Sequence, residues 1–136
     1  MNKPRTKSKK ERRNKILYWV ATLWLSLGMT ATGIVQLIRN KDEVALFNSL
    51  GYPMYLLVII GVWKLLGVIA VLVPKFPLVK EWAYAGFFFV MSGAVISHLA
   101  INDAPKELFG PLLLIVLTIL SWYFRPANRK LIALNK

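Results

Sequence analysis

Four long apolar segments separated by short polar connections dominate the pattern along the chain. They are residues 16–38, 54–73, 82–101 and 108–124. Each has a length in the range of about 17–25 residues that a helix needs to cross a hydrocarbon core. Barrel strands are not expected, because they alternate apolar and polar positions, and a segment in lipid must satisfy its own backbone hydrogen bonds. The pattern predicts an all-α membrane protein, a bundle of four transmembrane helices.

The three connections differ in their helix-ending signals. Residues 39–53 combine charges with Asn, Gly and Pro but also hold apolar positions, so we expect a short amphipathic helix at the membrane interface. Residues 74–81 contain two prolines and are predicted to form a tight turn. In residues 102–107, Asn102 or Asp103 is expected to be the N-cap of the fourth helix.

The positive charge is concentrated at the ends of the chain. Residues 1–15 hold eight of the eighteen Lys and Arg residues and form one basic tail, and residues 125–136 form a second. With the N-terminus inside, the inner regions hold fourteen Lys and Arg residues and the outer loops three. The positive-inside rule therefore predicts that both termini are cytoplasmic. The first apolar segment exceeds a typical signal-peptide core of about 7–15 residues, so we expect it to be retained.

Composition narrows the classes of function. The net charge of +12 flanks membrane segments, and no zinc-finger spacing or aromatic RNA-binding pattern accompanies it, so the expected partner is the lipid bilayer and not nucleic acid. The chain has no cysteine, which excludes disulfides, thiolate metal sites and a dithiol relay. Its single histidine predicts no metal site. No phosphate-binding loop, dinucleotide motif, catalytic triad or carboxylate pair is present, so the sequence predicts no catalytic residue.

One lysine, Lys64, stands in the middle of the second apolar segment, roughly 15 Å from either end at about 1.5 Å per residue. A central lysine costs about 2.5–3.5 kcal/mol on insertion, and the thirteen Leu, Ile and Val residues of the segment return about 4–8 kcal/mol. Gly61, Lys64 and Gly67 share an arc of roughly 120°. This predicts an inward-facing lysine between two glycines that allow close helix packing. Lys64 is either a ligand, anion or proton site, or a lysine that only fixes helix packing.

Further polar candidates lie toward the outer ends of the first and third segments. His98 is either a proton-accepting or ligand-binding group or an interfacial histidine bonded to a loop carbonyl. Gln36 lies at a similar depth, and Gly93 with Ser97 forms a small-residue pair typical of helix packing. Together they predict an interior polar pocket with Lys64 as its floor, Gln36 and His98 near its rim, and Ser97 among the ligand-binding candidates.

Several short motifs resemble the DoxX-like family of small bacterial four-helix membrane proteins. They are GYP at residues 51–53, KLLG at 64–67, EWAYAG at 81–86 and the Ser97-His98 pair. Family members often carry a Gly-Asp pair after the histidine, and here only Asp103 of the Asn-Asp pair matches. The resemblance implies a four-helix fold in the bacterial inner membrane. The broader DoxX group is named after a subunit associated with a thiosulfate:quinone oxidoreductase, and no catalytic residue carries over.

From these observations we expect an accessory subunit of membrane redox processes. It would bind a small molecule near Lys64, either a quinone or a lipid headgroup. No cofactor is evident from the residues, and the candidate cofactor is a quinone. The expected partners are a second copy of the chain or a redox subunit. An oxidoreductase would need a partner that supplies the electron carrier. Two alternatives remain: a small transporter or exporter that acts as an oligomer, and a purely structural scaffold.

Overall fold

Five α-helices and one short 3-10 helix make up the described part of the chain. A computed structural model describes residues 8–126, 129 and 130, and no strand occurs among them. The elements are α1 (Lys9–Leu37), α2 (Lys41–Ser49), α3 (Met54–Leu72), α4 (Pro77–Ala100), η1 (Pro105–Leu108) and α5 (Phe109–Tyr123). Four helical stretches are long and apolar enough to span a membrane: α1, α3, α4 and η1 with α5. This confirms the predicted all-α membrane bundle of four long helices.

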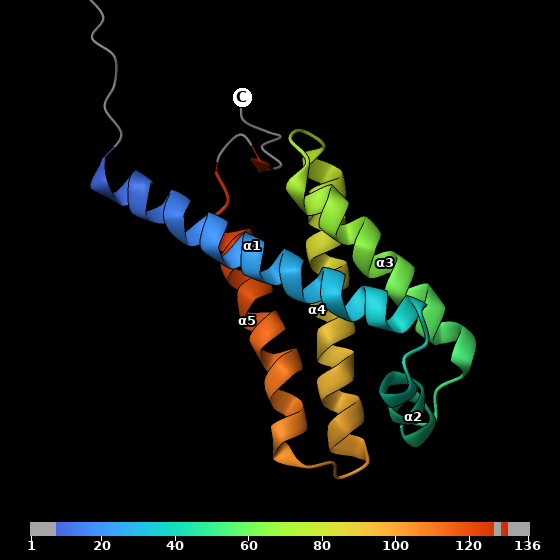
Figure 1. Cartoon of the computed structure of the whole chain (residues 1–136). Coiled ribbons are helices and arrows are strands. Elements are labelled where there is room, and N and C mark those ends of the chain that lie inside the picture. The colour runs from blue at the N-terminus through green and yellow to red at the C-terminus, as the bar shows by residue number, and fades with distance from the viewer. Residues whose placement is uncertain (1–7, 127–128, 131–136) are drawn as a thin grey trace, which may run out of the picture.

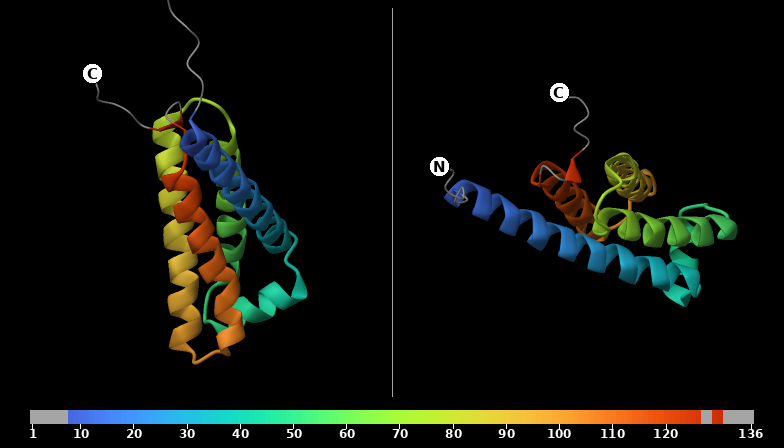
Figure 2. Two further views of the ribbon diagram at one scale, coloured as in Figure 1. Left: turned by 90° about the vertical axis from the view of Figure 1, so that its left-hand side faces the viewer. Right: turned by 90° about the horizontal axis from the view of Figure 1, so that it is seen from above.

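The long helices pack in two pairs that cross. α4 and α5 run side by side as an antiparallel hairpin, and α1 lies along α3 and crosses α5 at a wide angle (Figure 1). α3 also packs against α4. The views in Figure 2 show α2 beyond the end of α1, at the far end of the molecule from the beginning of α1. With four helices long and apolar enough to span a membrane, the chain is a multi-pass membrane protein.

The first helix begins earlier than the apolar pattern indicates. α1 starts at Lys9, and the Ser8 side chain accepts a hydrogen bond from the backbone N–H of Glu11 at 3.1 Å. A serine N-cap followed by a carboxylate in the first turn favours helix initiation at this point. Part of the predicted basic tail is therefore helical and continuous with the first membrane segment. The short helix expected within residues 39–53 is present as α2.

The predicted turn at residues 74–81 is too long. α4 begins at Pro77. Proline is favoured in the first helical turn because a backbone N–H at that position would have no intrahelical partner, so its absence costs nothing. Only the residues from Val73 to Phe76 separate α3 from α4, and Phe76 adopts a left-handed conformation with φ of 56°. Lys80, which the sequence pattern predicted to lie in the turn, is in α4 and only 1% exposed. Its ammonium donates to the Ala70 carbonyl at 2.9 Å and to the Val73 carbonyl, and so caps the end of α3.

The expected N-cap at Asn102 or Asp103 is wrong. The chain enters α5 through η1, whose first residue is Pro105 and whose N-cap, Ala104, makes no side-chain capping bond. Asn102 takes a left-handed conformation with φ of 55°. The Asp103 carboxylate turns back instead, toward the end of α4 and the N–H of Ala104.

The bundle interior combines an apolar cluster with interhelical polar contacts, among them a junction of three hydroxyls. At this junction the Ser121 hydroxyl of α5 lies 2.5 Å from the Thr22 hydroxyl of α1 and 2.8 Å from the Tyr84 hydroxyl of α4. Interhelical hydrogen bonds of this kind add to packing where lipid gives helices no hydrophobic drive to associate. The surrounding cluster contains Ala21, Leu25, Met29, Val68, Val71, Tyr84, Phe87, Met91 and Leu117.

Candidate functional site

Lys64 lies inside the bundle, with 6% of its surface exposed. Its side chain points toward α1, and the ammonium donates to the Thr32 hydroxyl at 3.1 Å. Thr32 in turn donates to the carbonyl of Gly28, one helical turn earlier, at 3.0 Å. The structure thus joins α3 to α1 by a short hydrogen-bond chain at the middle of the membrane span. The ammonium has three N–H donors, and one of them is used by Thr32.

The two glycines that flank Lys64 accommodate different neighbours. A Cβ atom on Gly61 would lie 3.0 Å from the carbonyl oxygen of Gly33, so Gly61 is where the backbones of α1 and α3 approach closely. A Cβ atom on Gly67 would lie 2.5 Å from the ring of Phe87 on α4. The lysine therefore sits between an α1 contact and an α4 contact, and not against a single partner helix.

The described part of the chain shows no close helix contact at Gly93, which the sequence suggested as a packing position. A Cβ atom on Gly93 would meet no other atom within 4 Å. Within the described residues, a larger side chain at this position therefore meets no steric obstacle. The Gly93 carbonyl accepts a hydrogen bond from Ser97 at 2.8 Å, a contact within the same helix.

His98 pairs with an acid from the following loop. Its Nδ1 atom lies 2.8 Å from Oδ2 of Asp103, and the imidazole is 5% exposed. The hydrogen bond from His98, assisted by the backbone N–H of Ala104, holds the pKa of the Asp103 carboxyl below its ordinary value. The loop-carbonyl partner considered for His98 is thus replaced by a carboxylate.

Gln36 and Ser97 tie the connection between α1 and α3 to the bundle. The Gln36 amide donates to the Glu43 carboxylate of α2 at 3.4 Å. The Ser97 hydroxyl of α4 bonds the hydroxyl of Tyr52, which lies between α2 and α3. Gln36 and Ser97 thus each have a hydrogen-bond partner of their own. No hydrogen bond of the described chain links either residue directly to Lys64 or to the His98 side chain.

A groove between α3 and α4 contains Lys64 and has a volume of about 510 Å³. We call this cavity the Lys64 groove. In the part of the chain that the structure describes, Lys64 is its only charged lining residue. Trp63 on α3 and Trp82 on α4 also line it, with exposed fractions of 60% and 67%. Gly67 and Phe87 form part of the wall between them. The groove is therefore mainly apolar and aromatic and is open toward the surface that faces lipid, and Lys64 contributes to its lining at membrane depth.

The sequence did not identify Thr32 or the pair of Glu81 with Arg125. Thr32 precedes Gln36 by one helical turn and so shares its face of α1, which is a usable signal. Glu81 accepts hydrogen bonds from the Trp122 indole at 2.9 Å and from the Arg125 guanidinium. No local pattern connects these residues, because they are more than forty positions apart.

Comparison with family models gives one finding that bears on this geometry. The model described as the DoxX-like family matches residues 20–121, which covers most of the chain and all four membrane spans in whole or in large part. The chain therefore belongs to the DoxX-like family. Comparisons with curated proteins and with solved structures give no match.

Proposed function

We propose that this DoxX-like protein is an accessory subunit of the bacterial inner membrane that binds a quinone-class molecule in the Lys64 groove. One observation carries the proposal: an aromatic groove, open toward lipid, has a single buried lysine in its lining. Pockets for small molecules are commonly apolar with a few placed polar groups. An intramembrane ionisable residue is by default a candidate functional group.

The chemistry of a quinone matches the groove. Its ring is flat and apolar on both faces, which suits contact with the indoles of Trp63 and Trp82. Its carbonyl oxygens accept hydrogen bonds, and two N–H donors of the Lys64 ammonium remain beyond the one given to Thr32. The isoprenoid tail stays in the bilayer, into which the groove opens. Bound in this way, the quinone is held for a partner subunit that exchanges electrons with it.

The scaffold alternative is favoured by a different observation, the hydrogen bond from Lys64 to Thr32. In that case the lysine only joins α1 to α3, and the groove holds lipid chains without preference. The two functions differ in whether a quinone enters the groove, which a binding experiment measures.

The experiment is a fluorescence titration of the detergent-solubilised full chain with a short-chain ubiquinone analogue. Trp63 and Trp82 line the groove, so a quinone bound between them quenches their emission. Lys64→Met removes the hydrogen-bond donor and is expected to weaken binding about tenfold, the effect of losing a charged hydrogen bond of about 1.5 kcal/mol.

A matched pair of glycine substitutions tests the groove itself. Gly86 lines the groove and Gly93 does not, both lie on α4, and a Cβ atom at either position meets nothing within 4 Å. Gly86→Leu is expected to fill the groove and abolish quenching by the quinone, while Gly93→Leu leaves it unchanged. Wild-type protein that shows no saturable quenching, or equal binding by the two leucine variants, would refute quinone binding in the groove and favour the scaffold.

A further inference from the structure

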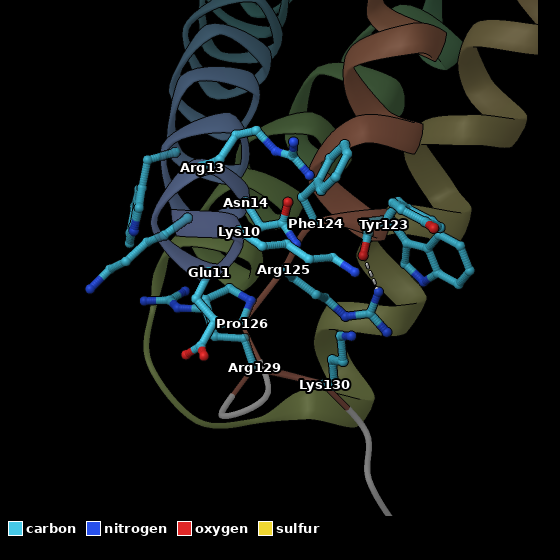
Figure 3. Close-up of a pocket in the computed structure, with 13 residues that line it drawn as sticks. Lys10, Glu11, Arg13, Asn14, Tyr123, Phe124, Arg125, Pro126, Arg129 and Lys130 are labelled. Carbon is cyan, nitrogen blue, oxygen red and sulfur yellow. Dashed lines mark hydrogen bonds between the residues drawn. The ribbon is translucent and has the colours of Figure 1, made fainter. Parts of the chain in front are cut away.

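We infer that the chain has a second ligand site, for the phosphate of an anionic glycerophospholipid. It lies in a hollow of about 1180 Å³ between the first turns of α1 and the segment that follows α5 (Figure 3). We call this hollow the basic pocket. It is on the side of the membrane that the charge distribution predicts to be cytoplasmic. Its six cationic lining residues are Lys10, Arg13, Lys15, Arg125, Arg129 and Lys130.

At least half of the cations that line the basic pocket form no ion pair with a carboxylate among the described residues. Within residues 8–126, 129 and 130, Glu11 is the only carboxylate that lines it. Among the described residues, Lys10, Arg13 and Lys130 form no ion pair with a carboxylate. Six cations around one hollow attract an anion, and positively charged side chains near the cytoplasmic membrane surface bind anionic lipids in proportion to their number.

Two arginines are fixed in place before any ligand binds. Arg125 is 9% exposed and bonds the Glu81 carboxylate and the Trp122 carbonyl, while its buried Nε atom has no hydrogen-bond partner. Arg129 donates to the carbonyl of Val71 at 3.1 Å, and its guanidinium lies 5.1 Å from the ring of Trp19. Immobilised guanidinium groups are suited to phosphate because their planar forks match its oxygens.

A buried acceptor adds a second requirement on the ligand. The Oδ1 atom of Asn14 is buried and has no hydrogen-bond partner among the described residues, and Asn14 lines the basic pocket. A buried polar atom left in this state costs free energy. A headgroup that carries hydroxyls beside its phosphate, as phosphatidylglycerol does, supplies the missing donor once the Asn14 amide turns toward the pocket.

The surroundings favour a lipid over a free phosphate ion. Trp19, Trp122 and Tyr123 line the same hollow, and tryptophan and tyrosine are enriched where membrane meets water. A phospholipid whose phosphate is held there by the arginines places its acyl chains toward the apolar surfaces of α1 and α5. A free phosphate makes no use of the aromatic part of the lining.

The test measures lipid binding to the detergent-solubilised full chain by native mass spectrometry. Phosphatidylglycerol is compared with phosphatidylcholine, and a parallel arm measures thermal stabilisation by phosphatidylglycerol and by inorganic phosphate at matched ionic strength. The pocket variant is Lys10→Gln with Arg13→Gln. The control is Lys9→Gln with Arg12→Gln, which removes the same charge from exposed positions of the same helix turns outside the pocket.

The pocket variant is expected to bind phosphatidylglycerol about thirtyfold more weakly, because each of the two pocket cations that it removes strengthens binding about fivefold. The control is expected to bind about as well as wild type, because Lys9 and Arg12 do not line the pocket. Equal weakening in both variants would mean diffuse attraction by the basic segment and would overturn the pocket. Unchanged binding by the pocket variant would overturn it as well. Stabilisation by inorganic phosphate that matches that by the lipid would assign the site to the free ion. Quinone quenching at the Lys64 groove stays unchanged in all these variants, so the two proposals fail separately.

Discussion

Replacing Gly67 by alanine should strain the contact between α3 and α4. The added Cβ atom would lie 2.5 Å and 2.7 Å from two carbons of the Phe87 ring, whereas carbon atoms in favourable contact lie about 3.5–4.0 Å apart. The ring would have to move by about 1 Å. It is only 4% exposed and belongs to the apolar cluster, so the shift disturbs its neighbours. Overpacking of this kind costs about 1–3 kcal/mol, offset by at most about 1 kcal/mol from the helix propensity of alanine.

The contact predicts a rescue that a general loss of helix packing does not. Phe87→Leu alone should cost about 1–2 kcal/mol through the lost ring contacts, but it removes the atoms that collide with the new methyl group. The double variant should therefore be less destabilised than the sum of the single variants by about 1–2 kcal/mol. Gly93→Ala is the control on a neighbouring helix, since its Cβ atom meets nothing within 4 Å.

The assay is equilibrium unfolding in mixed micelles with increasing dodecyl sulfate, followed by the emission of the five tryptophans. A change of about 1.4 kcal/mol alters the ratio of folded to unfolded chain tenfold, which this titration resolves. Additive free energies for Gly67→Ala and Phe87→Leu, or equal effects of Gly67→Ala and Gly93→Ala, would refute the proposed contact between α3 and α4.

Three further predictions concern polar contacts. Thr32→Val should cost about 1–3 kcal/mol in the same assay because it leaves the Lys64 ammonium without its partner, whereas Lys64→Met should be near neutral because apolar residues often replace buried charges without loss. Ser121→Ala should cost about 1–3 kcal/mol, since it removes the common partner of two interhelical hydroxyl contacts, and a fully stable variant would contradict this. The His98 hydrogen bond lowers the pKa of Asp103 in the folded chain. The ionised Asp103 carboxylate should therefore stabilise the fold fully above the unfolded pKa of about 3.9, and this stabilisation should be lost as the pH falls through the lower folded value. Melting temperatures of wild type and Asp103→Asn should converge in acid and differ near neutral pH.

The fold could be predicted because the helical structure of the apolar segments is imposed by the lipid around them and does not depend on long-range contacts. A segment of the length of Met54–Leu72 has few stable alternatives in lipid. The ends of the helices were less predictable. Ser8 extends α1 into the basic tail, and Pro77 starts α4 inside the expected turn, because capping and proline geometry act locally and override hydropathy.

The candidate site could be predicted only in its parts. Burial of Lys64 follows from the cost of a charge facing lipid, but its partner Thr32 depends on how α1 crosses α3, which one sequence does not specify. The glycine spacing indicated close packing, yet Gly61 and Gly67 contact different helices. The residues expected around a common pocket instead form separate pairs, such as His98 with Asp103.

The basic residues show most directly why counting charges is insufficient. The positive-inside rule treats every Lys and Arg near the cytoplasmic surface alike, because it reflects insertion before the helices pack. In the folded chain Lys80 and Arg129 both donate to carbonyls at the end of α3, where a cation also favours the helix dipole. Lys10, Arg13 and Lys130 line the basic pocket and have no such structural use in the described contacts. Their charge is the part that a bound anion can neutralise, so the sequence count predicts an orientation while the packing decides which cations are available to a ligand.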